Sequence, residues 1–103
     1  MKRQPKPIEL KAQRTRFFSQ LDEGTFFAWL KELPCVSTVE GRGDLLFIRV
    51  IESKVDEYAL RELLALFRRY GIDMKQLAVF DKQEFAHWFH NRDAYWYKSV
   101  FGS

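Results

Sequence analysis

The sequence has little of what commonly crosslinks a protein or anchors it in a membrane. It contains one cysteine, Cys35, so no disulfide can form within the chain. The longest apolar run is far shorter than the ~18 residues that a membrane helix needs. The basic N-terminus does not lead into the apolar segment of a signal peptide. We therefore expect a reducing, cytoplasmic setting and no membrane partner.

The signatures of catalysis and of cofactor binding are missing as well. The sequence has neither a Gly-x-Ser-x-Gly nucleophile elbow nor a P-loop, and the Gly-Arg-Gly segment at 41–43 is too short for a dinucleotide fingerprint. Glu84, His87 and His90 are spaced to share one broad helix sector, but a di-iron bundle needs a second such motif and zinc needs further ligands. The sequence predicts no enzyme activity, no metal and no cofactor.

The net charge of +3 is unevenly distributed along the chain. Residues 1–16 carry a net charge of +5, whereas residues 17–103 carry −2. The first segment also contains Pro5 and Pro7 and few large apolar side chains, a composition typical of a mobile terminus. We therefore predict a flexible basic arm at 1–16, whose second half could become helical on binding, and one globular domain at 17–103. The basic side chains of the arm are Lys2, Arg3, Lys6, Lys11, Arg14 and Arg16.

Two long helices are predicted from capping residues and apolar periodicity. The first spans 23–33, with Asp22 as its N-cap and apolar side chains at helical spacing after it. The second spans 57–70, with Asp56 as its N-cap and Gly71 at the position where glycine commonly ends a helix.

A β-hairpin is predicted between these helices. Its strands are 36–40 and 45–51, both rich in β-forming residues, and the Gly-Arg-Gly-Asp segment at 41–44 has turn chemistry. The resulting fold class is a small α+β domain, in which a β-hairpin is packed by three to four helices.

The segment 74–80 has two readings. Residues 77–80 could add a third short strand beside the hairpin. Alternatively, Asp73 caps a helix with Gln76 as its capping-box partner. The helix is favoured, because the capping pattern is specific and a strand of this length is a weak signal.

Aromatic side chains are concentrated near the C-terminus, in the segment HWFHNRDAYWYKSVFG at 87–102. Helices are predicted at 82–90 and 94–101, and the spacing of most of the rings matches inward-facing helix positions. The rings predicted to form the wall of the core are Phe85, Trp88, Phe89, Tyr97 and Phe101.

Two rings of this segment are predicted to lie at the surface. Tyr95, Trp96 and Tyr97 cannot all face inward on one helix, because neighbouring side chains are ~100° apart. Tyr95 and Trp96 lie close in sequence to Arg92 and Lys98, and exposed Tyr and Trp with basic neighbours are typical of binding hot spots. The predicted partner-binding group is therefore Arg92, Tyr95, Trp96 and Lys98.

A second reading concerns nucleic acid. Residues 57–80 have the apolar spacing of a helix-turn-helix, whose second helix enters the major groove of DNA. The basic arm would supply most of the affinity. The candidate contacts are the six basic side chains of the arm together with Arg68, Arg69, Lys75 and Gln76.

The leading hypothesis from the sequence is a non-enzymatic protein-binding module, such as a small bacterial inhibitor of the immunity-protein kind. It depends on the abundance of aromatic side chains and on the lack of catalytic motifs. One alternative is the nucleic-acid-binding protein. The other is a structural subunit in which the aromatic edge joins two copies as a homodimer.

Overall fold

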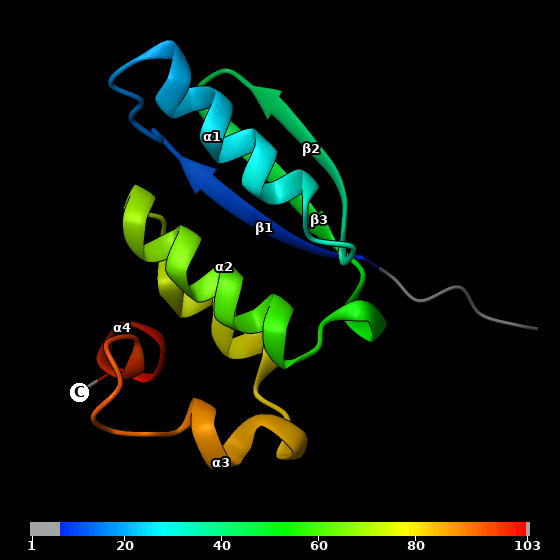
Figure 1. Ribbon diagram of the computed structural model, residues 1–103, viewed down its shortest axis with the longest axis vertical. Helices are drawn as coiled ribbons and strands as arrows, with labels where there is room; N and C mark the ends of the chain where they lie inside the picture. Colours follow the sequence, from blue (N-terminus) through cyan, green and yellow to red (C-terminus); the bar gives the residue numbers. More distant parts are fainter. Residues whose placement is uncertain (1–6, 103) are drawn as a thin grey trace, which may run out of the picture.

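Residues 7–102 are described by a computed structural model, in which a sheet and several helices surround one hydrophobic cluster (Figure 1). The strands are β1 (Ile8–Gln13), β2 (Val36–Arg42) and β3 (Leu45–Val50). The α-helices are α1 (Gln20–Lys31), α2 (Glu57–Tyr70), α3 (Ala86–Phe89) and α4 (Tyr97–Phe101). The 3₁₀ helices are η1 (Glu52–Lys54), η2 (Met74–Phe80) and η3 (Gln83–Phe85). The predicted α+β class is confirmed.

The sheet is antiparallel and has the strand order β1-β3-β2, so β3 lies in its centre. The hairpin between β2 and β3 is confirmed, and its turn places Gly43 at a φ of 60°, in the left-handed region that favours glycine. A β-bulge interrupts the register of β2 at its beginning, between Val36 and Thr38.

The third strand of the sheet is β1, in a segment that the sequence composition assigned to the mobile arm. β1 pairs with β3 along its whole length, and its Leu10 and Ala12 are buried. Apolar and polar residues alternate over 8–13, the pattern of a strand with one buried face. The prediction of a flexible arm is therefore wrong for 8–13, and the alternative third strand at 77–80 is wrong as well. Lys2, Arg3 and Lys6 lie outside the described residues.

The sheet buries only one of its two faces. Leu10, Ala12, Ile48 and Val50 share this face and are buried, and α1 lies in front of it in Figure 1. The side chains that alternate with them, among them Phe47, are exposed or partly exposed. The opposite face of the sheet is therefore open, and the helices pack against the buried one.

Helix α2 begins and ends at the residues that its capping pattern predicts. The Asp56 side chain accepts a hydrogen bond from the Ala59 N–H at 2.8 Å, as an N-cap does. Gly71 follows the helix with a φ of 67°. Val55 and Leu60 are both buried, as expected if they pack on each other across the helix start.

Helix α1 begins earlier than predicted, because its N-cap is Ser19 and not Asp22. The Ser19 hydroxyl accepts a hydrogen bond from the Asp22 N–H at 3.1 Å. The Asp22 carboxylate in turn accepts one from the Phe18 N–H at 2.9 Å. Asp22 thus acts as the returning acid of a capping arrangement, one turn after the cap itself.

Aromatic contacts join the start of α1 to the end of α2. The ring of Phe26 lies 5.2 Å from that of Phe17 and 4.9 Å from that of Tyr70, measured between centroids. The Tyr70 hydroxyl donates a hydrogen bond to the Asp22 carbonyl at 3.3 Å. These contacts fix one helix against the other on the buried side of the sheet.

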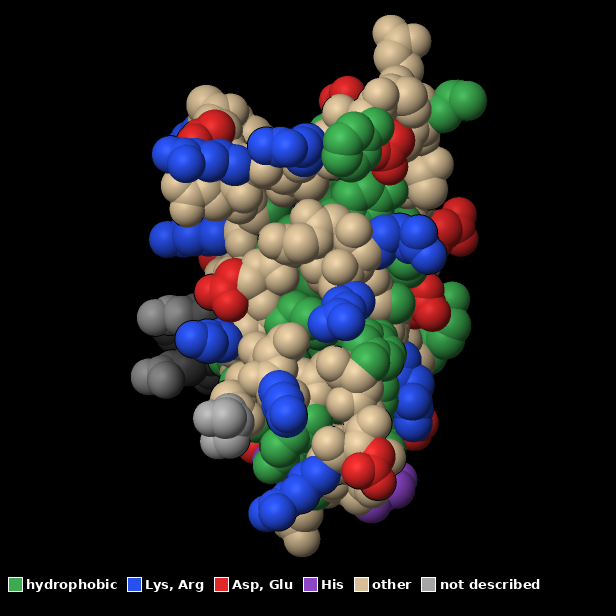
Figure 2. Space-filling model, turned by 90° about the vertical axis from the view of Figure 1, so that its left-hand side faces the viewer, with side chains coloured by type: hydrophobic (Ala, Val, Ile, Leu, Met, Phe, Trp, Pro, Cys, Tyr) green, Lys and Arg blue, Asp and Glu red, His purple; other side chains and the backbone are tan. Residues whose placement is uncertain are grey.

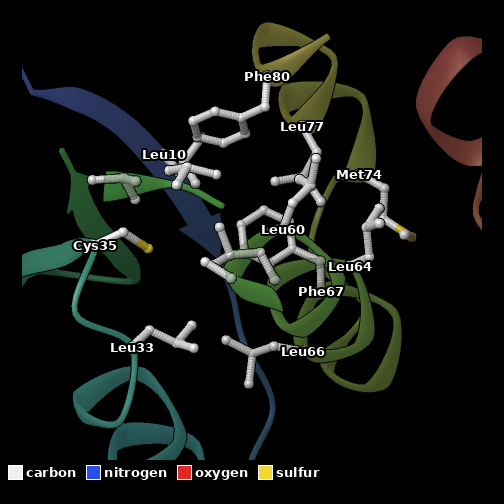
Figure 3. Close-up of a cluster of buried hydrophobic side chains, with 14 of the residues drawn as sticks. Leu10, Leu33, Cys35, Leu60, Leu64, Leu66, Phe67, Met74, Leu77 and Phe80 are labelled. Carbon is white, nitrogen blue, oxygen red and sulfur yellow. The ribbon is translucent and has the colours of Figure 1, made fainter. Parts of the chain in front are cut away.

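The segment 74–80 is helical, as the capping signal predicted, but it is a 3₁₀ helix. Asp73 accepts a hydrogen bond from the Lys75 N–H at 3.1 Å. Side chains three residues apart lie above one another in a 3₁₀ helix. Met74, Leu77 and Phe80 have this spacing, and all of them point into the core shared with α2 (Figure 3).

The free edge of β1 is hydrogen-bonded by the side chain of Gln76. Its Oε1 accepts from the Lys11 N–H at 2.7 Å, and its Nε2 donates to the Lys11 carbonyl at 2.8 Å. One amide side chain therefore makes both bonds that a neighbouring strand would make with this residue. This contact holds η2 beside the sheet and covers part of an edge that would otherwise be open to pairing.

The C-terminal helices are shorter than predicted. Only 86–89 and 97–101 are α-helical, and turns occupy much of the segment between them. The Asp81 carboxylate lies 2.7 Å from Nε2 of His90, whose ring stacks on Phe101 at 4.4 Å between centroids.

Replacing Gln76 by Ala is expected to lower the free energy of unfolding by about 1–2 kcal/mol, because the substitution removes two hydrogen bonds to Lys11. Gln83 is an exposed glutamine of the neighbouring 3₁₀ helix, so Gln83→Ala is the matched control and should change the value by less than about 0.5 kcal/mol. Urea denaturation measures both. Equal effects of the two substitutions would contradict the role given to Gln76.

Candidate interaction surface

Most of the C-terminal aromatic segment is buried, as predicted. Phe85, Trp88 and Phe89 are 3%, 7% and 0% exposed, and Trp88 packs edge-on against Trp96 at 5.7 Å between centroids. The Phe101 ring lies 4.9 Å from that of Phe89 and is partly buried. These rings form one wall of the core.

Trp96 is also buried, so its prediction as an exposed contact residue is wrong. Only 7% of it is exposed, and its Nε1 donates a hydrogen bond to the Phe89 carbonyl at 2.8 Å. The prediction assumed that 94–97 is a continuous helix, whereas α4 begins only at 97. Because the backbone turns before Tyr97, the helical rotation between neighbours does not apply there. Trp96 points inward and Tyr97 is partly buried.

Tyr95 is exposed, as predicted, and lies beside α2. It is 48% exposed and its ring stands 5.0 Å from that of Trp96. Its partial burial raises the pKa of the phenol above its usual value, with smaller and opposing effects from Arg68 and Glu62. The hydroxyl is therefore protonated at neutral pH and available as a hydrogen-bond donor.

Arg61 of α2 is held over the buried tryptophans. Its Cζ lies 4.2 Å from the centroid of the Trp88 ring and 5.9 Å from that of Trp96. Its Nε is 2.9 Å from Oε2 of Glu57, one turn earlier on the helix. The guanidinium is thus fixed by an aromatic face and a carboxylate.

Four side chains together form what we call the tyrosine–arginine surface: Tyr58, Arg61, Arg68 and Tyr95. Tyr58 is 62% exposed and lies three residues before Arg61, on the same side of α2. Tyr58 and Arg61 are candidate contact residues that the sequence did not suggest. The signal that could have found them is a tyrosine on the otherwise charged face of a strongly amphipathic helix.

The remaining predicted contact residues are brought together at another place. Arg92 and Lys98 line a hollow of about 360 Å³ together with Tyr97 and Gly102. Tyr95 is not among the residues that line this hollow. The structure therefore divides the predicted group, with one part beside α2, one part at this hollow, and Trp96 inside the core.

The residues predicted to contact nucleic acid do not form a helix-turn-helix. The element after α2 is a 3₁₀ helix, and the Gln76 amide is occupied by the backbone of Lys11. Lys75 is exposed on that 3₁₀ helix, and Arg68 and Arg69 are exposed in the last turn of α2. The unit at 57–80 therefore lacks the second α-helix that would enter a major groove.

Basic side chains are nevertheless spread over one side of the molecule. Figure 2 shows Lys and Arg running down the side where β1 and α2 end, with fewer acidic side chains between them. Arg14 and Arg16, which follow β1, are exposed, and Nε of Arg14 lies 3.2 Å from Oδ2 of Asp44.

Cys35 is fully buried at the start of the hairpin. Burial raises the pKa of its thiol above the usual value, and the nearby carboxylate of Asp56 adds to this effect. The thiol is therefore protonated and shielded, which is the opposite of the environment that activates a nucleophilic cysteine.

Comparison with known proteins gives no match for this chain among family models, curated proteins or solved structures. Within residues 7–102, no group of three or more His, Cys, Asp or Glu side chains is placed to hold a metal ion. None of the described helices has the length and apolar character to cross a bilayer.

Trp96→Ala is expected to lower the free energy of unfolding by about 3–5 kcal/mol, because it empties a buried ring site and leaves the Phe89 carbonyl without its donor. Tyr95→Ala, the neighbouring control, should cost less than about 1 kcal/mol because the ring is half exposed. Urea denaturation compares the two. A larger loss from Tyr95→Ala would reverse the assignment of core and surface.

In the native protein, the Cys35 thiol is expected to react with a disulfide reagent at least ~100-fold more slowly than the amino acid cysteine does in solution. After unfolding, the two rates should be similar. The raised pKa lowers the thiolate fraction, and burial blocks access. The rate is followed by absorbance at mildly alkaline pH, with and without guanidinium. Fast reaction in the native protein would contradict the buried position.

Proposed function

We propose that this protein is a non-enzymatic protein-binding module whose contact surface is the tyrosine–arginine surface. Its small size and its lack of a recognisable catalytic motif fit an inhibitor or accessory protein that works by occupying a partner, as immunity proteins do. The partner is a protein that meets α2 and the turn before α4.

The exposure of two tyrosines next to two arginines carries this proposal. Tyr58 and Tyr95 are 62% and 48% exposed, although tyrosine is a residue that folding usually buries in part. Tyrosine and arginine are enriched in protein interfaces and dominate their hot spots. Tyrosine has few rotatable bonds, so ordering it in a complex costs little entropy.

The base of this surface is rigid, which favours tight binding. Trp88 and Trp96 pack edge-on beneath Arg61, and Trp96 is hydrogen-bonded to the backbone. A side chain that is already fixed in the free protein loses less conformational entropy when the partner arrives. Arg61 is such a side chain, and Tyr95 packs against the ring of Trp96.

The chemistry of the surface indicates what the partner presents. The Glu62 carboxylate, on the same helix, accepts a hydrogen bond from the Trp29 indole N–H at 2.9 Å. The Glu57 carboxylate forms a salt bridge with Arg61. Arg68 forms no salt bridge among the described residues. A partner surface with a carboxylate opposite Arg68 and apolar side chains opposite the tyrosines would be complementary.

The proposal is tested by placing the photo-crosslinking residue benzoylphenylalanine at Tyr58, at Tyr95 and, as a control, at the exposed His87 of α3. The labelled proteins are irradiated in a lysate of the source cells, and crosslinked products are identified by mass spectrometry. We expect one common partner from positions 58 and 95 and none from 87. A product at twice the mass of the chain would identify a second copy as that partner.

Affinity then checks the role of each residue. With the purified partner, Tyr95→Ala should raise Kd at least about tenfold, as hot-spot truncations do. His87→Ala should leave Kd unchanged. Crosslinking that is equal at all positions, or a Kd that does not respond to Tyr95→Ala, would rule out this surface as the contact site.

A further inference from the structure

We propose that the open face of the sheet binds single-stranded nucleic acid, with Phe47 as a stacking platform and with Lys11 and Arg42 as phosphate contacts. This surface is formed by the strands and contains none of the residues of the tyrosine–arginine surface. The inference therefore goes beyond the proposed function and stands on separate observations.

The position of Phe47 is the first observation. Phe47 lies on β3, the central strand, and points to the face that the helices leave open. Its cross-strand neighbours are Lys11 on β1 and Glu40 on β2. An aromatic ring in the middle of an uncovered sheet is the arrangement on which unpaired bases stack.

Two cations lie over the face of this ring. Nζ of Lys11 lies 6.0 Å from the ring centroid, and Cζ of Arg42 lies 5.7 Å from it. Neither side chain forms a salt bridge among the described residues. Because no carboxylate holds them, both side chains can swing aside when a base takes their place over the ring and can then contact the phosphates on either side of it.

The other charged side chains of the open face are paired with one another. Arg49, also on β3, pairs with Glu9 on one side and Glu40 on the other, both at 3.4 Å. These three side chains sum to −1, so Lys11 and Arg42 bring the face to a net charge of +1, and the two cations without a carboxylate partner lie around Phe47. This charge complementarity is the reason for choosing an anionic polymer as the occupant.

A hollow that is lined in part by Lys11 offers room for a base and groups to recognise it. It has a volume of about 610 Å³ and lies between the sheet and the loop after α2. Lys11, Gln13 and Leu45 line it from the sheet, and Asp73 lines it from the loop. The Gln13 amide and the Asp73 carboxylate are groups that bond to the edge of an unpaired base.

Single strands are favoured over duplex for a structural reason. A ring can stack only on a base that is not already stacked inside a helix. The described residues also offer no exposed two-helix unit of the kind that reads a major groove. With few phosphate contacts, the affinity should be micromolar and sensitive to salt.

The test is fluorescence anisotropy with labelled oligouridine and oligocytidine of about twelve nucleotides, and with a duplex of the same length as the control ligand. The full chain is titrated at about 50 and about 200 mM salt, where phosphate contacts differ strongly in strength. We expect micromolar binding of the single strands, weaker binding of the duplex, and loss of affinity at the higher salt concentration.

Substitutions on the open face separate stacking from charge. Phe47→Leu keeps an apolar side chain but removes the ring, and should weaken binding about tenfold. Phe47→Tyr should retain it. Lys11→Gln and Arg42→Gln should each reduce the slope of log affinity against log salt by about 0.7. These two side chains are exposed, so the charge test holds even if Phe47→Leu unfolds the protein.

Three controls place the site. Tyr95→Ala should leave oligonucleotide binding unchanged, which keeps this inference distinct from the protein-binding surface. Lys98→Gln removes an equal charge at the hollow beside α4 and should also have little effect. Absence of binding at the lower salt concentration overturns the proposal. Binding that survives Phe47→Leu but is lost when residues 1–6 are removed also overturns it, because the terminus would then be the site.

Discussion

The one-sided burial of the sheet is the constraint on which the rest of this structure depends. One face of the sheet carries the buried side chains Leu10, Ala12, Ile48 and Val50. The helices pack on this face because their own apolar stripes must also be shielded from water. The opposite face then has no layer to pack against it. Phe47 consequently lies at the surface and not in the core, between Lys11 on β1 and Glu40 on β2.

Burial of the C-terminal aromatic side chains supports the proposed contact surface beside α2. Trp88 and Trp96 fill the space beside α2, so the side chains above them rest on a firm base. Arg61 stacks on this base and Tyr95 stands against it. Of the proposed contact surface, only Tyr95 comes from the same segment as the two tryptophans that support it, and its exposure distinguishes it from them.

The two proposed surfaces differ in their physics. The tyrosine–arginine surface combines aromatic area with prearranged guanidinium groups, features that suit a protein partner and depend weakly on salt. The open face of the sheet has one ring and two unpaired cations, features that suit a flexible anionic strand and depend strongly on salt. Salt dependence and the choice of substituted residue therefore distinguish the two proposed binding modes.

The sequence by itself determined the elements whose signals are local. Asp56 and Gly71 fixed the ends of α2, the Gly-Arg-Gly-Asp turn fixed the hairpin, and Asp73 indicated a helical segment after α2. Caps and turns act through neighbouring backbone atoms, so their effect can be read along the chain. The exposure of Tyr95 could be predicted because three consecutive aromatic side chains cannot all face the core.

Only the tertiary structure decided the features that depend on partners distant in sequence. β1 is a strand because β3, far along the chain, pairs with it, and Gln76 covers its edge from still further away. Trp96 is inside because the chain turns before α4, which brings its indole to the Phe89 carbonyl. Composition made 8–13 look like an arm, although the segment alternates apolar and polar residues as a strand does. For Trp96 the sequence carries no comparable signal, because its burial depends on where the chain turns.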